Sequence, residues 1–207
     1  MTRPIDLRVV ELLAARLCHD LIGPVSAIGN GVELLADEEP EFVRDAVALV
    51  GDSARKASRY LQFYRFAHGF SGGGLAGPAP YLLAAEFFAQ TAIECDYRAE
   101  ARALPLDQQK LACAMLALAG EGLPRGGRLV VSADSSAGAI GPQIEATGRG
   151  AGPSPEIRAA LSLAIPTAEL TSRTVAGYFA GLLAEALGWR LVVADQPGGF
   201  RLVTETV

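Results

Sequence analysis

The chain has 207 residues, of which 50% are hydrophobic and 20% charged, and its formal net charge is −5. This length and apolar content exclude a disordered chain and allow one large domain or two small domains with their own cores. No basic run is longer than Arg55-Lys56, so the sequence lacks the positive footprint of a nucleic-acid-binding protein. We therefore expect protein partners and no nucleic acid.

The sequence shows neither a membrane segment nor a secretory signal. No stretch approaches the roughly 18 uninterrupted apolar residues of a membrane helix, and residues 1–6 lack the apolar core of a signal peptide. The three cysteines, at positions 18, 95 and 113, form no C-x-x-C pair and are odd in number, which disfavours a disulfide framework or a zinc site. A cytoplasmic protein with reduced thiols is expected, without membrane contact.

Two long amphipathic helices are predicted first. Over residues 5–36, apolar residues recur at intervals of three and four, at Val10, Leu13, Leu17, Leu21, Val25, Ile28, Val32 and Leu35. An acidic turn at 37–40 ends this helix, and a second follows to about residue 68, with its stripe at Val43, Val47, Val50, Ala54, Ala57, Leu61 and Tyr64. Two helices cannot enclose both stripes, so we expect a homodimer in which two hairpins form a four-helix bundle.

A Gly/Pro-rich segment at 71–80 predicts a linker between an N-terminal domain, residues 1–70, and a C-terminal domain, residues 81–207. The second domain is expected to be an α+β layer pair. Its predicted helices lie near residues 81–91, 107–122, 154–164 and 171–187. Its predicted strands lie near residues 93–97, 128–133, 139–146, 189–194 and 199–204.

His19 is the candidate reactive residue. It lies two positions from both Leu17 and Leu21, and two helical steps turn a side chain roughly 200° about the axis, so its imidazole should point outward. An outward histidine followed by Asp20 suggests a phosphoryl acceptor. The other histidine, His68, is interpreted as an ordinary surface residue whose positive charge would suit the end of its helix.

The run Arg16-Leu17-Cys18-His19-Asp20-Leu21-Ile22-Gly23-Pro24-Val25-Ser26 resembles the H box of histidine kinases. The wider segment from Cys18 to Leu35 resembles the ChpT-type histidine phosphotransferases of alphaproteobacteria. The order of the later elements is similar to the Bergerat-fold ATP-binding domain of histidine kinases. The resemblance implies that the Nε2 atom of His19 is phosphorylated and that Asp20 orients the ring and stabilises the imidazolium. It also implies that the phosphoryl group comes from the receiver of a CckA-like hybrid kinase and passes to CtrA-like and CpdR-like response regulators.

A kinase-type nucleotide site is expected to be absent. The two asparagine positions of that pattern fall on Ala114 and Leu118, which cannot ligate magnesium, and the adenine-binding aspartate position falls on Ala146. The phosphate lid is replaced by residues 169–175. We therefore expect a degenerate ATPase domain and no cofactor, with Mg²⁺ supplied by the partner receiver.

Receiver contacts are predicted around the histidine, at Arg16, Leu17, Asp20, Leu21, Gly23 and Ser26. Gly23 occupies the position where bifunctional kinases carry a Thr or Asn that aligns water, so we expect no hydrolysis of a receiver's aspartyl phosphate. Two alternatives to a phosphorelay phosphotransferase stay open here. One is a divergent ATP-dependent histidine kinase, and the other is a non-catalytic dimeric adaptor in which His19 is incidental.

Overall fold

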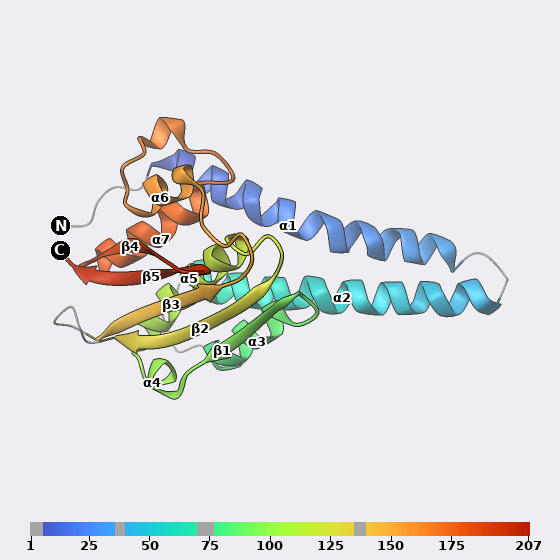
Figure 1. Ribbon diagram of the computed structural model, residues 1–207. Helices are drawn as coiled ribbons and strands as arrows, with labels where there is room; N and C mark the ends of the chain where they lie inside the picture. Colours follow the sequence, from blue (N-terminus) through green and yellow to red (C-terminus); the bar gives the residue numbers. More distant parts are fainter. Residues whose placement is uncertain (1–5, 36–39, 70–76, 135–139) are drawn as a thin grey trace.

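A computed structural model describes residues 6–35, 40–69, 77–134 and 140–207. It begins with an antiparallel hairpin of two long helices, α1 (Leu7–Leu34) and α2 (Pro40–His68) (Figure 1). Asp6 caps α1 by accepting a hydrogen bond from the Arg8 amide. Residues 37–39 of the predicted turn and 71–76 of the predicted linker lie outside the described residues. The hairpin confirms the two helices expected from the apolar period.

The far part of the hairpin extends away from the rest of the chain (Figure 1). Along it, α1 and α2 approach closely at Gly31, where an added Cβ would lie 2.6 Å from the Val50 Cγ2. Large apolar side chains on the hairpin nevertheless remain exposed, at Ile22, Val25 and Val32 of α1 and at Val47 and Leu61 of α2. The three residues of α1 are spaced by three and seven positions, and the two residues of α2 by fourteen. Each set therefore lies on one side of its helix.

The rest of the chain is a five-stranded sheet with helices, which confirms the mixed α+β class. The described elements are α3 (Pro80–Phe88), β1 (Ile93–Tyr97), α4 (Ala99–Arg102), α5 (Leu106–Glu121), β2 (Gly127–Asp134), β3 (Gly141–Thr147), α6 (Pro155–Leu161), the 3-10 helix η1 (Thr167–Glu169), α7 (Val175–Ala186), β4 (Trp189–Gln196) and β5 (Gly199–Thr206). The short helices α4 and η1 were not predicted from the sequence.

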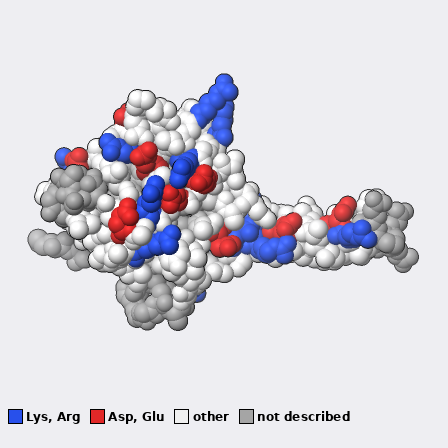
Figure 2. All heavy atoms as spheres, turned by 60° about the horizontal axis from the view of Figure 1, so that its bottom comes forward, with Lys and Arg blue, Asp and Glu red and all other residues white. Residues whose placement is uncertain are grey.

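The strands lie in the order β1-β2-β3-β5-β4, with β1 parallel to β2 and the other neighbours antiparallel. Side chains alternate across the sheet as strand geometry requires, so Ile144 and Ala146 of β3 are buried while Glu145 between them is not. On the face in Figure 2, acidic and basic side chains are interspersed. Asp96 pairs with both Arg98 and Arg128, each at 3.1 Å.

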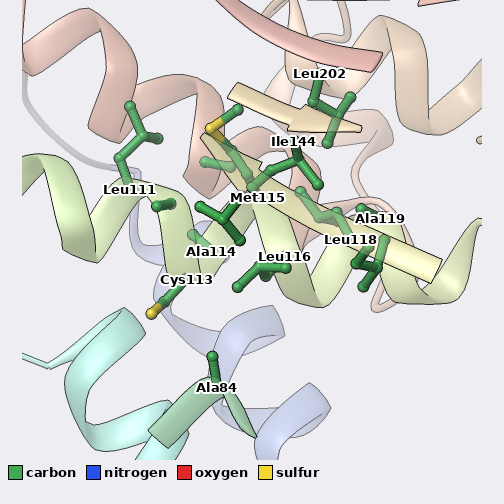
Figure 3. Close-up of a cluster of buried hydrophobic side chains, with 14 of the residues drawn as sticks. Ala84, Leu111, Cys113, Ala114, Met115, Leu116, Leu118, Ala119, Ile144 and Leu202 are labelled. Atoms are coloured by element: carbon green, nitrogen blue, oxygen red, sulfur yellow. The ribbon is translucent and has the colours of Figure 1, made fainter. Parts of the chain in front are cut away.

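The core is built around α5, whose stretch from Leu111 to Ala119 is apolar on all sides and therefore must be enclosed. Its side chains from Leu111 to Ala119 pack against Ile144 and Leu202 of the sheet (Figure 3). Phe63, Phe66 and Ala67 from the end of α2 belong to the same cluster as Leu83 and Phe88 of α3. The base of the hairpin is therefore packed into the core of the α+β region.

The first turn of α1 is also attached to that region. Val9 is buried with Leu170, Val175 and Tyr178, the Arg8 guanidinium donates to the Leu170 carbonyl at 3.0 Å, and the Thr167 hydroxyl donates to Asp6 at 2.7 Å. A small apolar contact and two hydrogen bonds thus hold α1 against η1 and α7. Both helices of the hairpin are fixed to the same body.

The interpretation of His68 as a charged surface residue is wrong. Its ring stacks on Tyr64, with centroids 5.3 Å apart, and its Nδ1 is buried without a hydrogen-bond partner among the described residues. Burial lowers the pKa of His68 to about 4, and the charges of Lys110 and Arg16 contribute to the decrease. The residue is therefore a neutral packing residue at the base of the hairpin.

Among the described helices, α1 alone is long and apolar enough to cross a membrane by length and composition. That criterion is weak evidence, because packed helices and N-terminal signal sequences also satisfy it. In the folded chain, Arg16 and Asp20 of this helix are bonded to groups of α5 and α2. α1 is thus an amphipathic helix whose polar side chains bond to α2 and α5.

Candidate functional site

His19 projects from α1 as the helix period predicts, with 84% of its side chain exposed. Its Nδ1 lies 3.4 Å from Oδ1 of Asp20, the next residue along the helix. When Nδ1 carries the proton and donates to this carboxylate, the Nε2 lone pair is available to an electrophile. The two candidate residues are therefore adjacent in the geometry that a nucleophilic imidazole needs.

Asp20 is held by two further side chains. Its Oδ2 accepts a 2.7 Å hydrogen bond from the Tyr64 hydroxyl of α2 and pairs with the Arg16 Nε of α1 at 3.3 Å. Only 17% of its side chain is exposed, in contrast to the neighbouring histidine. The carboxylate is thus a mostly buried group that links the two helices beneath an exposed imidazole.

Arg16 extends the network to the α+β region. Its guanidinium pairs with Glu121, at the end of α5, at 2.5 Å and donates to the Ser172 carbonyl at 3.3 Å. Burial disfavours the Arg16 charge, but the Glu121 and Asp20 carboxylates more than compensate and raise its pKa. Burial raises the pKa of Glu121, and the Arg16 charge opposes that shift. Arg16 is therefore fixed by both partners rather than free to swing.

Two hollows lie on either side of His19. The larger, about 930 Å³, extends toward α6 and the segment before α7, with Glu156, Ser172 and Arg173 among its lining residues. The other, about 440 Å³, extends over α2, α3 and α5 and is lined by Gly23, Lys56 and Tyr60 among others. Arg16, His19, Asp20 and Glu121 border both hollows. The imidazole therefore stands on a ridge with room for a partner surface on each side.

The positions that carry nucleotide ligands in the kinase pattern are core positions in this chain. Ala114 and Leu118 of α5 are buried among apolar side chains (Figure 3), and Ala146 is buried opposite Leu129 and Phe200 in the sheet. The segment 169–175 is structured by η1 and by hydrogen bonds between Thr171 and Thr174. Ala114, Leu118 and Ala146 thus present buried apolar side chains at the expected ligand positions, whereas Thr171 and Thr174 of the segment 169–175 bond to each other.

The comparisons with known proteins decide the family. The model of the histidine phosphotransferase C-terminal domain matches residues 82–198. The protein phosphotransferase ChpT of Brucella abortus (strain 2308) is 35% identical over 200 residues, covering 93% of this chain and 94% of that protein. The chain belongs to the histidine phosphotransferase family. A solved structure described as a bacterial phosphotransferase is 31% identical and superposes with a TM-score of 0.82, covering 99% of this chain and 98% of that one.

As a histidine phosphotransferase of the phosphorelay type, the chain has the function expected from its sequence. Not all the predicted contact residues lie together. Gly23 borders a hollow beside His19 and Ser26 is exposed on the same helix, whereas Leu17 and Leu21 line a separate apolar hollow of about 480 Å³ with Leu61 and His68. Arg16 borders both His19 hollows but is already ion-paired.

Sequence reasoning on this histidine phosphotransferase missed Tyr64 and Glu121. Tyr64 was assigned only to the apolar stripe of α2, because helical spacing does not predict which group its hydroxyl will bond. Glu121 did offer a signal. A carboxylate in the last turn of a helix opposes the helix dipole, so it calls for a nearby cation. The sequence could not say that this cation is Arg16, 105 positions earlier.

Proposed function

We propose that His19 is the phosphoacceptor, taking the phosphoryl group from the aspartyl phosphate of a hybrid-kinase receiver and passing it to receiver domains of response regulators. The observation that carries this assignment is the exposed imidazole whose Nδ1 faces a carboxylate that is itself held in place. Of the two histidines, His68 is buried in aromatic packing and has no such setting. The CckA-like donor and the CtrA-like and CpdR-like acceptors follow from the resemblance of the sequence.

The transfer requires an in-line attack by Nε2 on phosphorus. The N–P bond forms as the P–O bond to the receiver aspartate breaks, the aspartate leaves as a carboxylate, and the ring becomes a cationic phosphoimidazole with its proton on Nδ1. Asp20 Oδ1 faces that proton and stabilises the positive charge. The reverse sequence delivers the group to the next receiver. Mg²⁺ and a lysine, both held by the partner receiver, would neutralise the phosphoryl oxygens.

The receiver would contact the ridge formed by His19 and its two hollows. Gly23 and Ser26 expose small surfaces on the next turn of α1, and Arg16 borders the same site while remaining tied to Glu121. Leu17 and Leu21 instead line the apolar hollow at the base of the hairpin, which belongs to the dimer face in this proposal. Because Gly23 has no side chain to align water, the protein would not hydrolyse the receiver's aspartyl phosphate.

The C-terminal domain, residues 81–207, would be a degenerate Bergerat-type ATPase domain that does not bind ATP. The support is the apolar packing of Ala114, Leu118 and Ala146. Filling these positions with oxygen ligands would place polar groups inside the core without partners. The protein would thus act as a carrier in the cytoplasm, dependent on another protein for its phosphoryl group.

A homodimer is proposed from the uncovered apolar face of the hairpin. Ile22, Val25 and Val47 are each more than half exposed in the single chain. Two hairpins packed through these faces would bury them in a four-helix bundle and leave His19 outside. The apolar hollow around Leu17, Leu21 and Leu61 would then be covered as well.

The decisive experiment follows labelled phosphate from a phosphorylated receiver domain to wild type, to His19→Ala and to the matched control His68→Phe. Wild type and H68F should acquire label that is lost in acid, as expected for phosphohistidine, and H19A should acquire none. Labelled ATP without a kinase should label none of the three. Label on H19A would contradict the site assignment, and label from ATP alone would indicate a divergent kinase.

A further inference from the structure

The two oxygens of the Asp20 carboxylate are used differently. Oδ2 receives both strong donors, the Tyr64 hydroxyl at 2.7 Å and the Arg16 Nε at 3.3 Å. Oδ1 faces only the His19 Nδ1, at 3.4 Å, among the described residues. This division matters because an aspartate beside an arginine tends to turn both oxygens toward the guanidinium in a bidentate pair.

We propose that Tyr64 is a positioning residue for phosphoryl transfer: its hydroxyl holds Oδ2 of Asp20 so that Oδ1 stays directed at His19 and fixes the imidazole with the proton on Nδ1. The inference deepens the proposed function and rests on it, since it takes His19 as the acceptor. Tyr64 itself touches neither phosphorus nor the imidazole. It acts through the carboxylate.

The Tyr64 ring is held by its neighbours on three sides. It stacks on His68 with an interplanar angle of 11° and makes edge contacts with Phe63 and Phe87, at centroid distances of 5.9 and 5.6 Å. A ring so enclosed has a fixed direction for its hydroxyl. Burial raises the pKa of Tyr64, and the bond to Asp20 adds to the rise, so the hydroxyl remains a donor.

The second donor is fixed independently. Arg16 is bonded to Glu121 of α5 and to the Ser172 carbonyl before α7. Asp20 is therefore bonded directly to groups of α1 and α2 and is linked to α5 through Arg16. If the Tyr64 hydroxyl were removed, Arg16 would remain in place and Asp20 would be free to rotate toward it, which would withdraw Oδ1 from His19.

Tyr64→Phe tests the proposal because it removes the hydroxyl and keeps the ring. The matched control is Tyr97→Phe in β1, whose buried hydroxyl makes no hydrogen bond among the described residues and which borders neither hollow beside His19. We expect the transfer rate at saturating phosphorylated receiver to fall about tenfold in Y64F, as for outer-shell partners of metal-bound histidines. The half-saturating receiver concentration should not change, and Y97F should match wild type.

The ¹⁵N shifts of the His19 ring, measured without a receiver, report where the proton resides. Y64F should lose population with the proton on Nδ1. A second variant, Asp20→Asn, should reverse the preference, because the amide oxygen would stay with the two donors and the amide NH₂ would face Nδ1 as a donor. Circular dichroism confirms folding, and D20N carries the test should Y64F not fold.

Three results would overturn the proposal. They are a wild-type rate in Y64F, a slower rate that comes entirely from weaker receiver binding, and a His19 tautomer unchanged in both Y64F and D20N. The final extent of labelling of His19 separates a failure of this inference from a failure of the proposed function. Y64F should still reach full labelling of His19 more slowly, whereas failure of the proposed function would appear as label on H19A.

Discussion

At the scale of single residues, the two histidines show how environment determines what one side chain can do. His19 is exposed and faces a carboxylate that can fix its proton. His68 is packed against Tyr64 and Phe179, and its Nδ1 has no partner among the described residues. The same imidazole is therefore a candidate nucleophile at one end of the network and an apolar filler at the other.

His68 should make the fold sensitive to acid. Its pKa is lowered from 6.5 to about 4, so below pH 6.5 the unfolded chain takes up a proton that the folded chain does not. The free energy of unfolding should therefore decrease as the pH falls from 6.5 toward 4, by about 2 kcal/mol at pH 4.5 from this group. His68→Phe should remove that part of the loss, as measured by urea unfolding at pH 7 and pH 4.5.

Tyr97→Phe is the control for this prediction, because it removes another buried polar atom without a partner among the described residues but no histidine. Its loss of stability between the two pH values should match that of wild type. An H68F protein that loses as much stability in acid as wild type would show that His68 is already protonated in the native state, contrary to its burial.

At the scale of elements, the sequence predicts the helices and strands that are long enough for their apolar residues to show a period. Both long helices, α5 and the five strands were found because their apolar residues recur over several turns or alternations. The helix α4, only four residues long, and η1, with three, contain too few residues to show a period. His19 and Asp20 could be identified because they are adjacent in sequence, but the Tyr64 contact joins residues 44 positions apart and depends on how α2 packs against α1.

The packing of α1 on α2 depends on Gly31. A Cβ there would lie 2.6 Å from Val50 Cγ2 and 3.3 Å from the Ala46 carbonyl oxygen. Overpacking of this kind costs about 1–3 kcal/mol, whereas replacing a helical glycine by alanine alone gains about 0.5–1 kcal/mol. We therefore expect Gly31→Ala to lower the free energy of unfolding by about 1 kcal/mol in urea titrations.

Gly51→Ala in α2 is the matched control. The added Cβ would meet only the flexible Arg55 guanidinium, 3.3 Å away, so the gain in helix propensity should dominate and stability should rise by roughly 0.5 kcal/mol. Equal effects of the two substitutions would mean that the helices do not approach as closely at Gly31 as the structure shows.

At the scale of the whole molecule, the hairpin is fixed to the α+β region at both of its helices. Val9 and Arg8 attach the start of α1 to α7 and the segment before it, Arg16 attaches its middle to α5, and Phe63 places the end of α2 in the main core. The reactive ridge thus has a fixed geometry relative to both hollows. The apolar face of the hairpin that extends away from this region, with Ile22, Val25 and Val47, remains exposed in the single chain.

Val47→Glu should separate the proposed dimer without unfolding the chain. Val47 is 57% exposed in the single chain, so a glutamate there is solvated in the monomer, but it would be buried as a charge in a four-helix bundle. Sedimentation should give wild type twice the 21.6 kDa chain mass and V47E the chain mass alone. The melting temperature should rise with protein concentration for wild type and not for V47E, because association stabilises only the folded dimer.

Ala48→Glu is the control. Ala48 is also exposed but lies one residue further round the helix, between Arg44 and Asp52, so the A48E protein should remain dimeric. A monomeric wild type at micromolar concentration, or a dimeric V47E, would show that this face does not join two copies.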